Sequence, residues 1–315
     1  MIPRGYSVRA ATWDDLPAVL AMIRLCDISD WGSPDYGEED LRHDWGMPEL
    51  ELARDTWLVM EEGGTPIGYT WLLARADHTA LDTWGTVHPD HRGRGVGRSL
   101  LGLMELRAGE HAALAPAERE VRLHNHIVGT DRQAHTLLEA SGYLLARHSW
   151  RMDVKLEAEP VVPEPPAGIS VRSFRPEGDA RTVHAVVEEA FAEHWGWVPR
   201  SFEDWAAVRL GERLDPELWF LASDGPEVAG VLLGGVSDGI GWVETLGVRP
   251  AWRGRGIGEH LLRLSFAEFY RRGLPDVSLN VDAGNETGAT RLYERVGMHV
   301  ARVYDTYKKL MRDPA

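Results

Sequence analysis

The chain contains the same glycine-rich segment twice. The first copy reads Val87-His88-Pro89-Asp90-His91-Arg92-Gly93-Arg94-Gly95-Val96-Gly97, and the second reads Val248-Arg249-Pro250-Ala251-Trp252-Arg253-Gly254-Arg255-Gly256-Ile257-Gly258. The separation is 161 residues (258 − 97) and is constant along the motif. Solenoid repeats are far shorter. The period therefore predicts duplication of a whole domain, and a chain of 315 residues has room for two.

A segment rich in proline and glutamate separates the two copies. Residues 156–168 hold four prolines and three glutamates, which predicts an extended, semi-rigid linker. Directly after it, Ile169-Ser170-Val171-Arg172 repeats the pattern of Tyr6-Ser7-Val8-Arg9. We therefore expect an N-terminal domain over residues 1–155, a linker over 156–168 and a C-terminal domain over 169–315.

Hydrophobic periodicity predicts the same element order in both halves. In the first half we expect helices at 13–28, 95–113 and 130–140, with strands at 56–60, 67–73, 81–87, 121–124 and a closing pair within 143–155. In the second half we expect helices at 179–192, 256–272 and 286–296, with strands at 218–222, 228–233, 240–248, 277–281, 299–303 and 305–310. This order predicts two α/β domains, each with a mixed sheet flanked by helices.

Each glycine-rich segment has the properties of a diphosphate-binding loop. It follows a strand and opens an amphipathic helix, whose first N–H groups and positive dipole end favour a phosphate. Glycines let a ligand approach the backbone closely, and the flanking arginines add charge. No Gly-Lys-Ser/Thr follows either loop, and the spacing G-x-G-x-G differs from the G-x-G-x-x-G of a Rossmann turn. Nucleotide hydrolysis and hydride transfer are therefore disfavoured.

These loops, together with Leu292-Tyr293-Glu294-Arg295-Val296-Gly297-Met298, resemble the GCN5-related N-acetyltransferase (GNAT) superfamily. The resemblance covers both halves and implies a mostly antiparallel sheet in each. It also implies acetyl-CoA as acyl donor, with the loop on the coenzyme A pyrophosphate and the preceding strand on the pantetheine arm. The coenzyme-binding residues would be Leu246, Gly247, Val248, Arg253, Gly254, Arg255, Gly256, Ile257, Gly258 and Asn285 in the second half, and Val87, Arg92, Gly93, Arg94, Gly95, Val96 and Gly97 in the first. The fused layout is similar to the mycothiol synthase branch.

Two residues of the second half are catalytic candidates. Acetyl transfer to an amine needs a base for the amine and benefits from an acid for the leaving thiolate. Glu244 lies on the strand before the loop, where GNAT enzymes often place a base; alternatively it is a solvated strand carboxylate. Tyr293 matches the tyrosine that protonates the coenzyme A sulfur in the family, and its phenol is a proton donor at neutral pH; alternatively it is a packing aromatic.

The first half departs from this pattern. Leu138 stands where the second half has Tyr293, and Thr130 stands where it has Asn285. Thr83 aligns with Glu244, with Asp82 beside it on the other face of a regular strand. We expect the first half to bind acetyl-CoA or to be structural, although a β-bulge at Asp82 would leave a catalytic role open.

The acceptor site is harder to predict. The segments expected to shape it are rich in tryptophan and acids (Trp31, Asp35, Tyr36, Trp45; Glu193, His194, Trp195, Trp197, Trp205). An aromatic wall with a carboxylate could bind an ammonium group, but for any single tryptophan a core position is the stronger expectation. We expect no metal, since no cluster has recognisable ligand spacing.

Composition limits the partners. The formal net charge is −15, which argues against nucleic-acid and membrane binding and is compatible with a cationic substrate. Cys26 is the one cysteine, and no apolar stretch approaches the length of a membrane span. We expect no signal peptide and a cytoplasmic, reducing location. We predict an N-acetyltransferase for a small-molecule primary amine, acting by direct attack, as a monomer or homodimer. Alternatives are acetylation of a cysteinyl amine, as in mycothiol synthase, and a non-catalytic acyl-CoA-binding or sensor protein.

Overall fold

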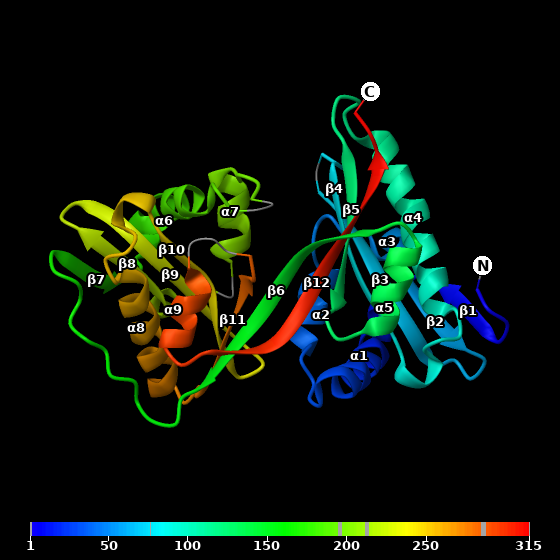
Figure 1. Cartoon of the computed structure of the whole chain (residues 1–315), viewed down its shortest axis with the longest axis horizontal. Coiled ribbons are helices and arrows are strands. Elements are labelled where there is room, and N and C mark those ends of the chain that lie inside the picture. The colour runs from blue at the N-terminus through cyan, green and yellow to red at the C-terminus, as the bar shows by residue number, and fades with distance from the viewer. Residues whose placement is uncertain (1, 76, 195–196, 212–213, 285–287, 315) are drawn as a thin grey trace. The chain divides into compact units, whose positions relative to one another are not determined.

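The computed structural model describes residues 2–75, 77–194, 197–211, 214–284 and 288–314. The chain forms two compact units (Figure 1). Unit 1 comprises Met1–Ser149 and Arg302–Ala315, and unit 2 comprises Trp150–Ala301.

Unit 1 is a sheet covered by helices on both faces. Its elements are β1 (Tyr6–Arg9), η1 (Trp13–Asp15), α1 (Leu16–Trp31), α2 (Glu38–Trp45), α3 (Leu52–Asp55), β2 (Thr56–Glu61), β3 (Pro66–Ala74), β4 (Ala80–Val87), η2 (Pro89–His91), α4 (Val96–Leu114), β5 (Val121–Val128) and α5 (Arg132–Ala140). Strand alternation separates the two faces: Leu58 packs with Leu20 of α1, whereas its neighbour Val59 packs with Val96 and Leu100 of α4. The strand order is β1-β2-β3-β4-β5-β12, where β12 is His299–Arg312; β4 and β5 are parallel and the other pairs are antiparallel.

Unit 2 repeats the arrangement. Its elements are β7 (Ile169–Ser173), α6 (Pro176–Phe191), α7 (Phe202–Arg209), η3 (Pro216–Leu218), β8 (Trp219–Asp224), β9 (Glu227–Ser237), β10 (Ile240–Val248), η4 (Pro250–Trp252), α8 (Ile257–Arg271), β11 (Asp276–Asp282) and α9 (Ala289–Arg295). The strand order is β6-β11-β10-β9-β8-β7, where β6 is Leu144–Lys155, and β10 and β11 run parallel. One core joins Phe266 and Phe269 of α8, Leu221 and Leu232 of the sheet, and Val183 of α6. The predicted fold class, two α/β domains with mixed and mostly antiparallel strands flanked by helices, is confirmed.

The closing strands divide the chain differently from the expected domain boundaries. β6 (Leu144–Lys155) starts in unit 1 and ends in unit 2, and β12 (His299–Arg312) starts in unit 2 and ends in unit 1. The end of β12 pairs antiparallel with β5, with Thr306 opposite His126. Residues 302–315 thus pack in unit 1, although we expected them in the C-terminal domain. Duplicated domains offer equivalent edges to either closing strand, so the sequence pattern does not distinguish the two pairings.

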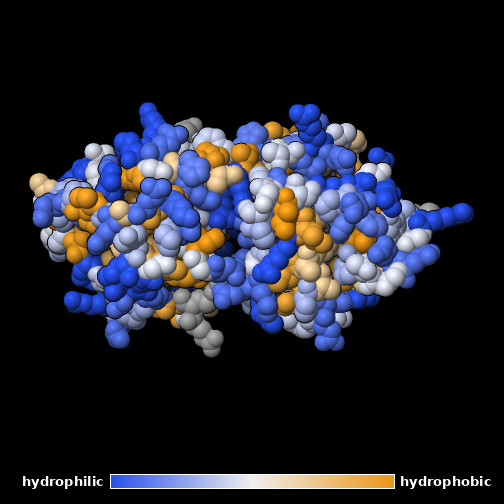
Figure 2. Space-filling model, turned by 90° about the horizontal axis from the view of Figure 1, so that it is seen from below, coloured by the Kyte–Doolittle hydropathy of each residue, from blue (hydrophilic) through white to orange (hydrophobic). Residues whose placement is uncertain are grey.

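Other differences are local. The closing pairs expected within 143–155 and 299–310 are single long strands, and the short helices α2 and α7 were not predicted. On the face drawn in Figure 2, hydrophobic residues are interspersed among hydrophilic ones. None of the helices in the described ranges is long and apolar enough to cross a membrane.

Candidate active site

The second glycine loop joins η4 to α8 through a backbone that favours glycine. Gly256 is the N-cap of α8 with φ of 82°, a left-handed conformation that costs other residues energy. Gly258, two residues further on, lies against α9: a Cβ there would be 3.2 Å from Leu292 Cδ2. The loop therefore leaves the first N–H groups of α8 open to an anion and lets α8 pack closely on its neighbours.

The loop arginines have protein partners. Arg253 donates from Nε to Val248 O at 3.2 Å and from Nη2 to Ala190 O at 2.9 Å, so it ties the end of α6 to the end of β10. Arg255 Nη1 lies 2.9 Å from an Asp224 carboxylate oxygen. Both were expected to contribute charge to a phosphate. These partners show that Arg253 also holds the loop in place and that Arg255 pairs with a carboxylate of the protein.

A cavity of about 440 Å³ opens where β10 and β11 diverge. The parallel register covers Gly241↔Val277 and Trp242↔Ser278, and the antiparallel register of β10 with β9 shifts between Val243 and Thr245. Such a bulge bends the strand and interrupts its pairing with β9, which resumes at Thr245↔Leu233. The predicted coenzyme residues that line the cavity are Leu246, Gly247, Val248, Arg253, Gly254, Gly256, Ile257 and Gly258. The cavity is therefore continuous from the loop to the bulge.

Glu244 lies at this bulge and lines the cavity. Its carboxylate forms an ion pair with Arg209, the last residue of α7, and the two side chains are 37% and 32% exposed. On the β9 side, Gly235 leaves room for the carboxylate: a Cβ at Gly235 would lie 2.4 Å from Glu244 Oε1. The sequence placed Glu244 on the right strand, but neither the bulge nor Arg209 was foreseen.

Tyr293 lies on α9 and lines the same cavity. Its side chain is buried, and burial raises the pKa of the phenol to about 12. The phenol therefore keeps its proton at neutral pH. Asn285, the other residue predicted near the coenzyme, lies outside the described residues.

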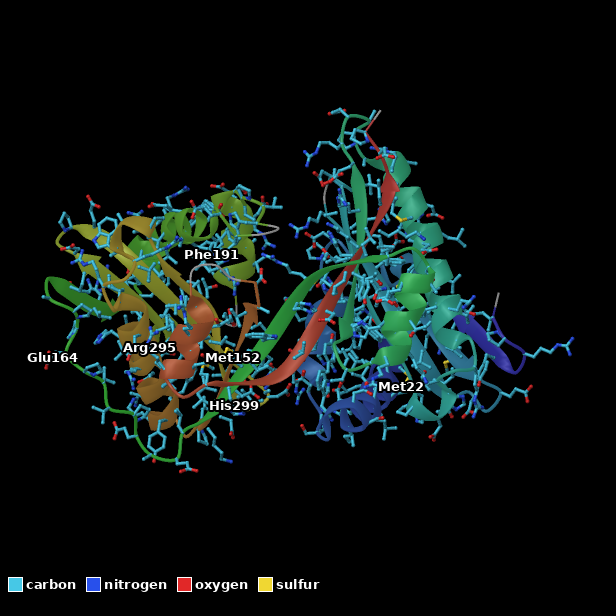
Figure 3. The ribbon with its side chains drawn as sticks, viewed as in Figure 1. Met22, Met152, Glu164, Phe191, Arg295 and His299 are labelled. Carbon is cyan, nitrogen blue, oxygen red and sulfur yellow. The ribbon has the colours of Figure 1, made fainter. Side chains whose placement is uncertain are left out.

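Further polar groups reach the cavity from elements that the sequence did not connect to it. Asn280 and Asp282 lie on β11 beyond the divergence, and His194 follows α6. Figure 3 labels two more lining residues, Phe191 at the end of α6 and Arg295 on α9. The strand predicted at 277–281 could have located Asn280, since it follows the buried Val277 and Leu279. No group of three metal-ligating residues is found in the described part of the chain.

Several of the aromatic residues considered for an acceptor wall pack elsewhere. Trp45 is buried in the core of unit 1, where its Nε1 donates to Tyr69 Oη at 2.6 Å. Trp205 is buried in the core of unit 2. Trp195 lies outside the described residues. The core interpretation therefore holds for Trp45 and Trp205.

Unit 1 has a corresponding cavity of about 320 Å³ at its own loop. Val87, Arg92, Gly93, Gly95 and Gly97 line it, and Gly95 caps α4 with φ of 86°. Arg92 again holds the strand end, with Nε 3.0 Å from Val87 O. Its guanidinium also forms a bidentate pair with Asp30 at 2.6 and 2.8 Å. The coenzyme-side architecture is thus present in both units.

The catalytic side of this cavity is different. Leu138 is buried and lines the cavity as Tyr293 does in unit 2. β3 and β4 pair from Gly68↔Val87 to Ala74↔Leu81 without a register shift. Asp82 is therefore not turned inward by a bulge, and its carboxylate lies 3.2 Å from His126 Nε2. Hydrogen bonds from His124 and His126 hold the pKa of Asp82 well below its usual range despite burial.

Comparisons with known proteins agree with this duplicated architecture. The Acetyltransferase (GNAT) family profile matches residues 181–298, and an Acetyltransferase (GNAT) domain profile matches residues 53–143. A mycothiol acetyltransferase from Thermobispora bispora is 36% identical over 294 residues, 90% of this chain and 92% of the relative. One from Streptomyces scabiei is 33% identical over 250 residues, 76% of this chain and 75% of the relative.

Solved structures give the same result. A GCN5-related N-acetyltransferase from Sphaerobacter thermophilus matches with a TM-score of 0.91 and 38% identity, covering 100% of this chain and 98% of that one. A tandem GNAT protein from the clavulanic acid biosynthesis pathway shares the fold, with a TM-score of 0.76 and 17% identity over 98% of this chain and 100% of that one.

Fold and family matches define a tandem of two GNAT domains. The chain belongs to the GNAT acetyltransferase family, and it is an N-acetyltransferase that uses acetyl-CoA as acyl donor.

Proposed function

We propose that acetyl transfer takes place in the cavity of unit 2, and that unit 1 binds the coenzyme without transferring its acetyl group. The observation that carries this proposal is the pairing of Tyr293 and Glu244 around one cavity, against Leu138 and an unbulged β4 around the other. The non-catalytic alternative gains no support from relatives that are named as acetyltransferases.

In this proposal the loop of unit 2 holds the pyrophosphate. N–H groups at the start of α8 donate to it, and the exposed backbone of Leu246, Gly247 and Val248 binds the pantetheine arm. The cavity fits such a ligand, because it runs from the loop to the bulge and a glycine borders it at 254, 256 and 258. In unit 1, Val87, Arg92, Gly93, Arg94, Gly95, Val96 and Gly97 take the same roles. Asn285 stays a predicted coenzyme contact.

Catalysis then needs two proton transfers. Glu244, directly or through one water, takes a proton from the acceptor ammonium, and the free amine attacks the thioester carbon. The C–S bond breaks, and Tyr293 gives its proton to the sulfur. The raised pKa of Tyr293, about 12, keeps the phenol protonated until this step.

The acceptor in this proposal is a small-molecule primary amine. Acidic residues at the cavity, Glu244, Asp282 and Glu259, favour a cation. A cysteinyl amine is the second candidate, because the relatives from Thermobispora bispora and Streptomyces scabiei are named mycothiol acetyltransferases. A cytoplasmic location and a monomeric or homodimeric state stay predictions.

The test is a panel of primary amines incubated with acetyl-CoA and the full chain. We expect coenzyme A release together with an N-acetylated product, detected by mass spectrometry, for at least one small amine. Cysteinyl amides, matched glycyl amides and aminosugars would separate the two acceptor candidates. Coenzyme binding without any acetylated product would refute the proposal.

A further inference from the structure

Arg209 forms an ion pair with the Glu244 carboxylate, the base of the proposed mechanism. Its guanidinium pairs with a Glu244 carboxylate oxygen at the bulge of β10. Arg209 is set there by α7: Ser201 caps that helix by accepting from Asp204 N at 3.1 Å, and Trp205 anchors it in the core. Both side chains therefore extend from ordered elements, whereas the ion pair itself lies at the surface.

A free carboxylate at this position creates a selectivity problem. Glu244 accepts a proton from water less readily than from an ammonium group, but water is present even when the acceptor is absent. Water would lose a proton to Glu244 and attack the thioester carbon through its oxygen. The C–S bond would break, Tyr293 would protonate the sulfur, and the products would be acetic acid and coenzyme A. Acetyl-CoA would then be lost whenever the acceptor is absent.

We propose that Arg209 is a positioning residue that blocks this side reaction by acting as an exchangeable counter-ion for Glu244. The proposal rests on the role of Glu244 as base. While the acceptor is absent, the guanidinium occupies the carboxylate. An incoming ammonium group competes for the same carboxylate through charge and displaces Arg209, whereas neutral water does not.

Exposure and charge support this exchange. Both side chains are about one-third exposed, and ion pairs of that kind are weakly stabilising and easily exchanged. Unit 1 offers a contrast, because the aligned residue Thr83 is buried and has no charge to neutralise. The counter-ion thus accompanies the candidate base.

The experiment measures coenzyme A release from acetyl-CoA with no acceptor. Arg209→Ala and Arg209→Gln should raise this hydrolysis by about three- to sixfold, because a weakly stabilising pair already leaves Glu244 uncovered for part of the time. Arg209→Lys should stay within about twofold of the wild type, because it keeps the cation. The double variant Arg209→Ala, Glu244→Gln should return to the wild-type rate.

Arg181→Ala is the matched control, since Arg181 is an exposed cation 3.5 Å from Glu203 of α7. It should leave hydrolysis unchanged. Unchanged hydrolysis in both Arg209→Ala and Arg209→Gln, with melting temperatures like that of the wild type, would overturn the proposal. So would increased hydrolysis that persists in the double variant.

A second measurement separates this inference from the proposed function. With L-cysteinamide as probe and the acetylated product measured by mass spectrometry, Arg209→Ala should lower KM for the amine, because a competitor is gone. Glu244→Gln should reduce kcat. If Glu244→Gln leaves kcat intact, the base assignment fails; if only the Arg209 results fail, the base assignment survives and the counter-ion is refuted.

Discussion

The substitution Gly235→Ala should lower the activity of the protein without lowering its stability. Gly235 lies in β9 with an ordinary backbone conformation, so alanine is sterically allowed in the strand itself. A Cβ there would lie 2.4 Å from Glu244 Oε1 and 3.3 Å from Glu244 Cδ. Both atoms belong to the end of a flexible side chain. The expected response is therefore rotation of Glu244 away from its position beside the cavity, with the strand unchanged.

Gly235→Ala should leave the free energy of unfolding nearly unchanged and should lower kcat strongly. An alanine that fits the backbone reduces the entropy of the unfolded chain and stabilises by about 0.4–1 kcal/mol, which offsets the cost of moving a partly exposed carboxylate. The melting temperature should stay within about 3 °C of the wild type. A displaced general base should cost about 10²-fold in kcat, the lower end of what such bases contribute.

The assay is steady-state acetylation of a panel amine, followed beside thermal unfolding. Gly178→Ala in α6 is the matched control, because an added Cβ there meets no atom within 4 Å. It should raise stability by up to about 1 kcal/mol and leave kcat unchanged. If Gly235→Ala keeps wild-type kcat and folds normally, the observed position of Glu244 is not the one that catalysis uses.

Other outcomes follow from Tyr293 and its counterpart. Tyr293→Phe should lower kcat about 10²-fold. Leu138→Ala should cost about 2–5 kcal/mol of stability and leave the kcat of the folded protein near that of the wild type. Equal losses of kcat in the two variants would contradict the assignment of catalysis to unit 2. Because burial raises the pKa of Tyr293 to about 12, its phenol should cause no loss of kcat between pH 7 and 10, and a limb near pH 8 that disappears in Tyr293→Phe would contradict this. The same residue should reduce stability only as the pH rises from about 10, where the unfolded phenol ionises, toward 12, measured as a shift in urea midpoint that Tyr293→Phe lacks.

The duplicated architecture was readable from sequence because it depends on local rules. Gly95 and Gly256 both cap a helix in a left-handed conformation, which is what their position between a strand and an amphipathic run predicts. Tyr293 and Leu138 were aligned correctly by the same repeat, and each lines its own cavity.

The remaining features depend on contacts between distant segments. Glu244 pairs with Arg209, which lies 35 residues away on α7, and no pattern in β10 itself reports this contact. The bulge at Glu244 is an irregularity of the β9–β10 pairing that the alternation of residues along β10 does not reveal either. The partner of Arg92, Asp30, lies 62 residues away. The end of β12 pairs with β5. Composition and periodicity do not predict this partner, because the two duplicated domains offer equivalent edges.

The most direct test of the division between the two units is a pair of matched loop variants. Gly95→Glu and Gly256→Glu place the same side chain at the same helix N-cap, with φ of 86° and 82°, so their backbone strain of about 1–2 kcal/mol is equal. Each puts a carboxylate where a pyrophosphate would bind. The measurement is kcat/KM for acetyl transfer, with calorimetric titration of acetyl-CoA to count the sites that remain. We predict that Gly256→Glu abolishes transfer and that Gly95→Glu keeps it within about threefold while losing one binding site. Loss of transfer in Gly95→Glu with activity retained in Gly256→Glu would contradict the assignment of catalysis to unit 2.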